Sequence, residues 1–215
     1  IGFAEMARRF GLPLNMLEVG ASAGLISNWD RYFYDCHGRS TGPATSPVRF
    51  TDRWDEPFDL SGLTPVVHRA ACDVAPLDAS DPDCRRRLLS FVWPDQTERF
   101  RVLRGALEVA DVHPPVVDRA DAGDWLDQRL TARPSGTATI VFHSIVWQYL
   151  PRTTKDRLRE VLRREGADAD PERPIAWIRL EPAQERADLR MTCWPGGDEE
   201  VLALGSYHGA GIRRP

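Results

Sequence analysis

Residues 14–25 constrain the fold more than any other stretch of the sequence. An apolar run from Leu14 to Val19 is followed by a turn of small residues, and a new apolar pattern begins at Leu25. A short, nearly continuous apolar run is typical of a strand that is covered on both faces, as in a parallel sheet. The stretch therefore predicts a strand, a tight turn and a helix, which together form the first unit of an α/β fold.

The turn favours close approach of the backbone to a ligand. It consists of five small residues: Gly20, Ala21, Ser22, Ala23 and Gly24. Its two glycines permit backbone angles that a side chain forbids, and free N–H groups at a helix start favour polar ligand groups. Glu18 ends the strand at the edge where open α/β sheets bind ligands, and a carboxylate prefers a hydroxyl or an ammonium group to a phosphate.

This stretch resembles motif I of class I S-adenosylmethionine-dependent methyltransferases, in which an acid precedes a glycine-rich turn. Ser22 stands where the motif has its middle glycine. The resemblance implies a Rossmann-like methyltransferase fold and S-adenosylmethionine as the cofactor, bound by Glu18 and the turn 20–24. An ordinary strand–turn–helix, with small residues chosen for packing alone, stays open as the alternative.

Composition and length limit the possible classes of protein. A chain of 215 residues, 42% hydrophobic and 28% charged, fits a single domain, here 1–215. A net charge of −4 argues against nucleic acid, and no apolar run reaches the roughly 20 residues of a membrane span. The four scattered cysteines predict no metal site and a cytoplasmic location. Because Ile1 falls inside a helical pattern, we expect the chain to be the C-terminal part of a longer one.

Acids follow the next two predicted strands. The strand 65–73 ends at Asp73, the position that takes ribose hydroxyls in a nucleotide-binding half. The strand 115–122 ends in Asp121 and Ala122, which resemble the pair that contacts adenine in methyltransferases. Asp121 fits a helix N-cap equally well.

Further polar and aromatic residues follow the later strands. His143 ends a strand within 137–150 and is a candidate general base, or a histidine that orients its loop through hydrogen bonds. Trp147 and Tyr149 either line an acceptor pocket or belong to the core. Glu181 ends the strand 174–181, and His208 lies on the return strand of a predicted hairpin over 188–209. Both are candidate substrate contacts.

Residues 38–65 form a long irregular region rich in proline turns. A loop of this length inside a compact domain is uncommon and often functional. It is predicted to be either a lid over the site or a surface insertion.

The whole chain resembles a bacterial family of unknown function, domain-of-unknown-function family 2332. The matching segments are residues 17–25, 30–32, 73–78, 93–96, 142–144, 180–182, 189–197 and 207–209. This resemblance implies a methyltransferase-like α/β fold, with a mostly parallel sheet flanked by helices and a C-terminal antiparallel hairpin. It implies no particular reaction.

The sequence is compatible with three functions. The first is an S-adenosylmethionine-dependent methyltransferase acting on a small-molecule substrate. The second is a catalytically silent methyltransferase-like module that binds a ligand or a partner. The third is a serine hydrolase, because residues 20–24 also match the G-x-S-x-G elbow, with Ser22 as nucleophile, His208 as base and Asp121 or Glu181 as acid. The sequence defines no oligomeric state.

Overall fold

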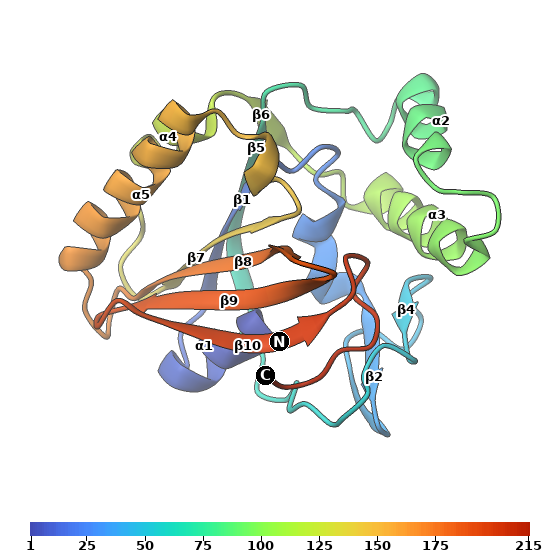
Figure 1. Ribbon diagram of the computed structural model, residues 1–215, viewed down its shortest axis with the longest axis horizontal. Coiled ribbons are helices and arrows are strands. Elements are labelled where there is room, and N and C mark those ends of the chain that lie inside the picture. Colours follow the sequence, from blue (N-terminus) through green and yellow to red (C-terminus); the bar gives the residue numbers. More distant parts are fainter.

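A seven-stranded sheet runs through the computed structural model, which describes residues 1–215 (Figure 1). Its order is β10-β9-β8-β7-β1-β5-β6. The parallel strands are β1 (Leu14–Val19), β5 (Val66–Asp73), β6 (Val117–Arg119), β7 (Ala138–Ser144) and β8 (Ile175–Ala183). Two antiparallel strands, β9 (Arg186–Trp194) and β10 (Asp198–Gly205), complete the edge beside β8.

The order of the strands creates a switch point at β1. The chain leaves β1 for β5 and β6 on one side, then returns to β7 and β8 on the other. Because β1 and β7 are parallel, their carboxyl ends meet at one edge of the sheet, with Glu18 opposite Phe142. Open α/β sheets bind their ligands in the crevice at such a point.

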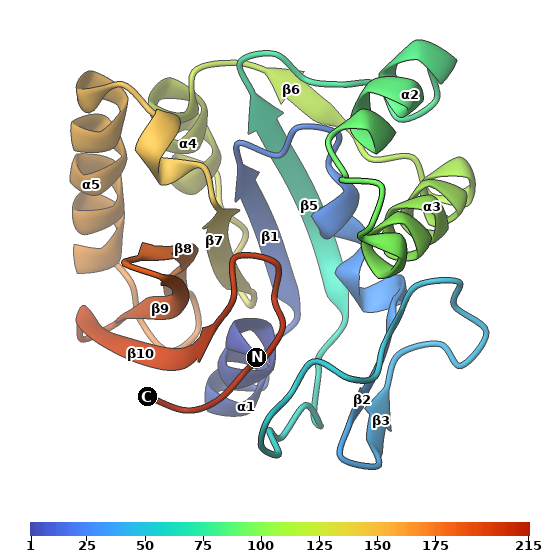
Figure 2. The same cartoon turned by 45° about the vertical axis from the view of Figure 1, so that its right-hand side comes forward.

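Helices cover both faces of the sheet (Figure 2). On one face lie α1 (Gly2–Phe10), the 3₁₀ segment η1 (Leu25–Arg31) and α3 (Thr97–Val112), with α2 (Pro82–Ser90) packed on α3. On the other face lie α4 (Ala122–Thr131) and α5 (Arg152–Ala167). No helix is long and apolar enough to cross a membrane.

Alternate residues of β1 enter two separate cores. Leu14 and Met16 pack with the α1 and η1 side, whereas Leu17 and Val19 pack with the α4 and α5 side. Both sets are buried, so the continuous apolar run predicted the covered strand correctly.

Most predicted elements are confirmed, including the C-terminal hairpin. Asp81 caps α2 by accepting a hydrogen bond from the N–H of Cys84, with Pro82 in the first turn. The segment after β1 differs, because it is a 3₁₀ segment with a kink at Asn28 instead of an α-helix.

The irregular region partly folds. With β2 (Phe33–Cys36), its strands β3 (Arg39–Thr41) and β4 (Arg49–Phe50) form a three-stranded sheet. The end of the region meets the start of β1, where the Pro65 carbonyl accepts a hydrogen bond from the N–H of Leu14. In Figure 2, β2 and β3 lie at the opposite end of the molecule from the tip of β1. That position does not favour the predicted lid.

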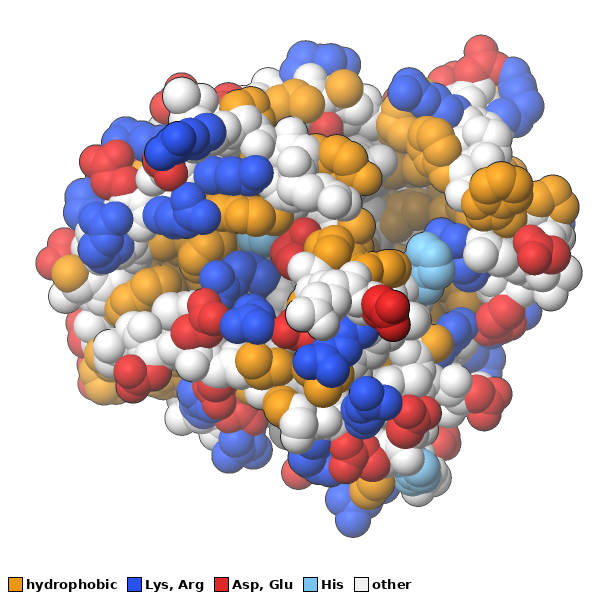
Figure 3. Space-filling view, in the orientation of Figure 1, with side chains coloured by type: hydrophobic (Ala, Val, Ile, Leu, Met, Phe, Trp, Pro, Cys, Tyr) orange, Lys and Arg blue, Asp and Glu red, His pale blue; other side chains and the backbone are white.

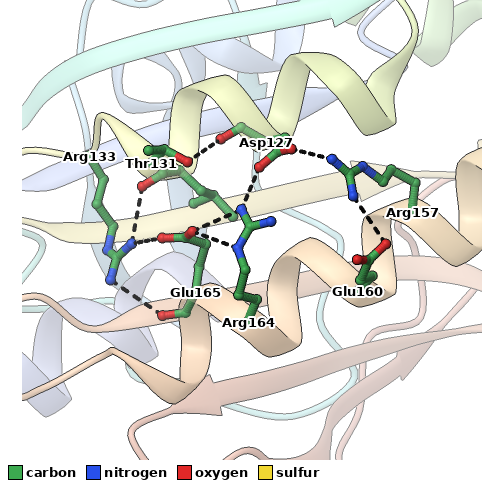
Figure 4. Close-up of polar contacts among 8 residues, drawn as sticks. Asp127, Thr131, Arg133, Arg157, Glu160, Arg164 and Glu165 are labelled. Carbon is green, nitrogen blue, oxygen red and sulfur yellow. Dashed lines mark hydrogen bonds and ion pairs between the residues drawn. The ribbon is translucent and has the colours of Figure 1, made fainter.

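Ion pairs join α4 to α5 (Figure 4). Asp127 of α4 accepts hydrogen bonds from Arg157 and Arg164 of α5. Arg133, which follows α4, is paired with Glu165 and also donates to the Leu130 carbonyl at 3.1 Å. The Arg133 side chain is only 2% exposed, so this pair belongs to the interior.

Candidate functional site

The turn after β1 is tied to β5 through its own amide groups. The N–H groups of Gly20 and Ala21 donate to the Cys72 carbonyl at 2.9 and 3.0 Å. The N–H of Ser22 donates to Asp73 at 2.8 Å. A phosphate-binding turn needs free N–H groups, and these three are already bonded within the protein. The expected free donors are therefore not found at the start of this turn.

Packing explains much of the turn's composition. Ala23 is buried in a cluster with side chains of α2 and α3. Gly20 has a φ of 69°, and a Cβ there would lie 2.3 Å from a methyl carbon of Val146. Gly24 has a φ of 68°, and its Cβ would lie 2.7 Å from Pro115. Both glycines are needed for conformation and for close approach of neighbouring loops.

Glu18 is a buried carboxylate at the switch point. It is 4% exposed, lies on the η1 face of the sheet, and accepts a 2.7 Å hydrogen bond from the Ser27 hydroxyl. It makes no ion pair. Burial raises the pKa of Glu18 to about 7; the hydrogen bonds from Ser27 oppose this shift, and the nearby charge of Asp73 adds to it. Ser27 was not predicted, because nothing in the sequence distinguishes it from other serines.

Asp73 lies beside the turn, as predicted, and orders two loops. One carboxylate oxygen accepts from the N–H of Ser22, and the other accepts from the N–H of Ala75 at 2.9 Å. These bonds fix the turn against the segment that follows β5. Ribose binding by Asp73 stays a prediction.

Asp121 caps α4. One of its oxygens accepts from the N–H of Gly123 at 2.8 Å, and the other accepts from the Thr154 hydroxyl at 2.6 Å. Ala122 is buried behind it. The N-cap alternative is thus observed, and contact of Asp121 and Ala122 with adenine stays a prediction.

His143 and Glu181 form a pair at the carboxyl ends of β7 and β8. The Nδ1 atom of His143 lies 2.6 Å from Glu181, which also accepts from the N–H groups of Val146 and Trp147 at 3.1 Å. Burial alone would raise the pKa of Glu181, but the bonds from His143 and the two amides leave this pKa below its ordinary value.

The His143 ring lies on the other face of the sheet from Glu18. It stacks on Trp147 at 5.4 Å and packs near Trp177, in the core beneath α4 and α5. The residue is 3% exposed, and its Nε2 atom is buried without a partner. The structure therefore brings Asp73 to Glu18, but separates His143 from both.

The loop after β7 is strained. Ile145 has a φ of 52°, in a region that β-branched residues rarely adopt. Glu181 holds this loop through the amides of Val146 and Trp147, and Val146 in turn contacts Gly20. The pair of His143 and Glu181 is thus connected to the turn 20–24 through the contact of Val146 with Gly20.

The remaining predicted residues lie at the surface. Tyr149 ends η2 (Trp147–Tyr149) and is exposed. His208 is also exposed, and its predicted place on the return strand is wrong, because β10 ends at Gly205 and His208 lies in the turn that follows. Burial and the nearby charge of Arg99 lower the pKa of His208. No hydrogen bond links Ser22 to a histidine, so the structure does not assemble the predicted serine triad.

The turn lines neither of two cavities in the protein, one of which lies away from the carboxyl edge of the sheet. One, of about 250 Å³, lies at the amino end of β5 and is lined by residues that include Trp29, Tyr32 and Tyr34. The other, of about 350 Å³, lies between η1, β5 and the segment 112–116. Figure 3 shows the surface hollowed beside α2 and α3. No group of three His, Cys, Asp or Glu side chains that could hold a metal ion is present.

The chain is an α/β protein with a mostly parallel sheet, and Glu18 is a buried acid at the switch point of that sheet. A profile of uncharacterised proteins conserved in bacteria, DUF2332, matches residues 1–214. The chain belongs to this family. Comparisons with curated proteins and with solved structures gave no significant match.

Proposed function

We propose that the protein is an S-adenosylmethionine-dependent methyltransferase that acts on a small-molecule acceptor. The observation that carries the proposal is Glu18, a carboxylate that is buried at the switch point with no cation beside it. Burial of a charge without a partner is costly, and the raised pKa of Glu18 reflects that cost. The ammonium group of the cofactor's methionine part would supply the missing partner.

Other features of the edge fit the same ligand. The turn offers no phosphate cradle, and S-adenosylmethionine carries no phosphate. Each oxygen of Asp73 accepts one backbone N–H and keeps a second lone pair, which leaves room for a ribose hydroxyl. Bound there, the cofactor would supply an electrophilic methyl group on its sulfonium.

In this proposal the chain's own contribution is mainly positioning. Glu18 orients the ammonium group, and Asp73 keeps the turn in place against β5. His143 faces the opposite core, so its role is to fix the loop of Val146 over Gly20 together with Glu181, and not to take a proton.

Calorimetric titration with S-adenosylmethionine tests the proposal. Saturable binding is expected, with an affinity that rises with pH up to about 7, because Glu18 must lose its proton to pair with the ammonium. Glu18→Gln should weaken binding by about tenfold or more and abolish this pH dependence. Glu108→Gln, an exposed change on α3, is the matched control and should have no effect.

Absence of binding by the wild-type protein across this pH range would contradict the proposal, and so would equal binding by Glu18→Gln. Turnover separates an enzyme from a silent cofactor-binding module. With the labelled methyl group of the cofactor and a small-molecule extract as acceptor, the enzyme transfers label into the small-molecule fraction. A module that only binds the cofactor transfers none.

A further inference from the structure

The larger cavity, of about 350 Å³, lies between η1, β5 and the connection from α3 to β6. Its lining does not include Glu18 or the turn 20–24. We infer that this cavity binds a small carboxylate carried on an apolar body. Nothing in this inference depends on the proposed methyl transfer.

Arg31, at the end of η1, is the main reason for the inference. It lines the cavity, and its Nε atom is buried without a hydrogen-bond acceptor. Arg31 also takes part in none of the chain's ion pairs or side-chain hydrogen bonds, although it is only partly exposed. A half-buried guanidinium left in this state is costly, and an anion in the cavity would give it an acceptor.

Arg69 forms a fixed wall and limits the charge that the site can hold. Its two terminal nitrogens each donate to Asp30 at 2.8 Å, and one also donates to the Ser27 carbonyl at 2.5 Å. Asp30 therefore offsets the charge of Arg69, and one guanidinium remains unpaired. A single unpaired positive charge near Asp30 favours a monoanionic carboxylate over a phosphate dianion.

The rest of the lining is neutral or apolar. The Asn28 amide donates to the His113 carbonyl at 2.8 Å, which joins η1 to the connection after α3 and closes one wall. Val112 and Val116 also line the cavity, and they are 71% and 78% exposed. Two exposed valines at the opening give an apolar body somewhere to pack.

Hexanoate is the probe, and its titration is followed by shifts of the backbone amide resonances of η1 and β5. Hexanamide has the same shape without the charge, and inorganic phosphate tests the preferred anion. Arg31→Gln removes the unpaired guanidinium. Arg104→Gln, an exposed and unpaired arginine on α3, is the matched control.

Hexanoate should bind saturably, and both the use of hexanamide and the change Arg31→Gln should weaken binding by about tenfold or more. Arg104→Gln should leave it unchanged. Val116→Asp, at an exposed position, should weaken binding about twofold to fivefold through charge repulsion, which keeps the test valid should Arg31→Gln not fold. Absence of hexanoate binding, equal effects of the two arginine changes, or tighter binding of phosphate would overturn the inference.

Discussion

The two faces of the sheet differ in whether a buried carboxylate has a cation beside it. Beneath α4 and α5, the buried Arg133 is paired with Glu165, and Asp127 joins two arginines (Figure 4). On the η1 face, Glu18 is buried without a cation and the Nε of Arg31 is buried without an acceptor.

This difference bears on where a ligand would stabilise the protein. A buried ion pair such as that of Arg133 and Glu165 joins two elements, and each charge offsets the other, although the Nε of Arg133 has no acceptor. A buried charge without a partner costs stability, and a folded chain tolerates it where a ligand can complete it. By this criterion the pair of Arg133 and Glu165 needs no ligand, and the two proposed sites lie on the η1 face, where Glu18 and Arg31 have no charged partner.

The largest effect is expected from breaking the pair on the closed face. Glu165→Met leaves Arg133 buried without its carboxylate and should lower the free energy of unfolding by about 3–5 kcal/mol. The double change Arg133→Met with Glu165→Met should recover most of this loss. Denaturant unfolding at neutral pH measures both.

Asp156→Asn is the control, because it breaks exposed pairs with Arg152 and Arg159 on the same helix and should cost about 1 kcal/mol or less. An equal cost for Glu165→Met and Asp156→Asn would show that burial does not distinguish the α4–α5 pairs.

Glu18→Gln should have the opposite sign. The pKa of Glu18 is raised from 4.5 to about 7, so the folded state holds the proton more tightly than the unfolded chain does. Stability is then full below about pH 4.5 and falls as pH rises through about 7. Glutamine keeps an acceptor for Ser27 without the charge, so near pH 8 the variant should be more stable by about 3 kcal/mol.

Unfolding curves near pH 5 and pH 8 test this, because the advantage of the variant should shrink toward the lower pH. A variant that is less stable than the wild type near pH 8 would mean that Glu18 has a partner in the folded protein. The contrast between the two faces would then fail.

The sequence predicted the elements better than the partners of their side chains. The apolar run of β1, the cap at Asp81 and the C-terminal hairpin depend on local patterns, and all three are present. The face on which His143 lies depends on the register of β7 against β1. A shift of one residue exchanges the faces of a strand, and no local pattern fixes that register.

The carboxylates at the strand ends show the same limit. Their positions at the sheet edge followed from the strands, but Asp73 and Asp121 each bind one group from a distant part of the chain besides a local backbone N–H. Asp73 binds the amide of Ser22, 51 residues away, and Asp121 binds Thr154, 33 residues away. The partner of Glu18 depended on the 3₁₀ conformation of η1, which the apolar pattern does not distinguish from an α-helix.

Glu181→Gln extends the comparison, because Glu181 lies near the end of β8, at the same edge as Glu18, but accepts several hydrogen bonds. It accepts from His143 and from two backbone amides, so loss of its charge should cost about 1–3 kcal/mol at neutral pH. Its pKa lies below the ordinary 4.5, so this stability is present above about pH 4.5 and is lost as pH falls further.

Thermal unfolding of the two glutamine variants across the acid and neutral range compares these carboxylates directly. Glu181→Gln should be destabilised most at neutral pH, whereas Glu18→Gln should gain its advantage there. Stability curves of the same sign for the two variants would contradict the assignment of partners.

The smallest effect is expected from Arg31→Gln. The Arg31 guanidinium has no acceptor in the folded chain, so its removal breaks no bond. Because the residue is partly exposed, relief of the buried Nε should raise the free energy of unfolding by no more than about 0.5 kcal/mol. Denaturant unfolding without added carboxylate measures this change. Glu165→Met, which removes the carboxylate partner of Arg133, is the comparison. A loss approaching that of Glu165→Met would reveal an intramolecular partner for Arg31.

With saturating hexanoate present, the wild type should gain stability through mass action and the variant Arg31→Gln should gain less. The difference in stability between the two proteins should therefore grow with ligand concentration. Such a ligand-dependent gain would distinguish Arg31 from Arg133, whose carboxylate partner is already part of the chain.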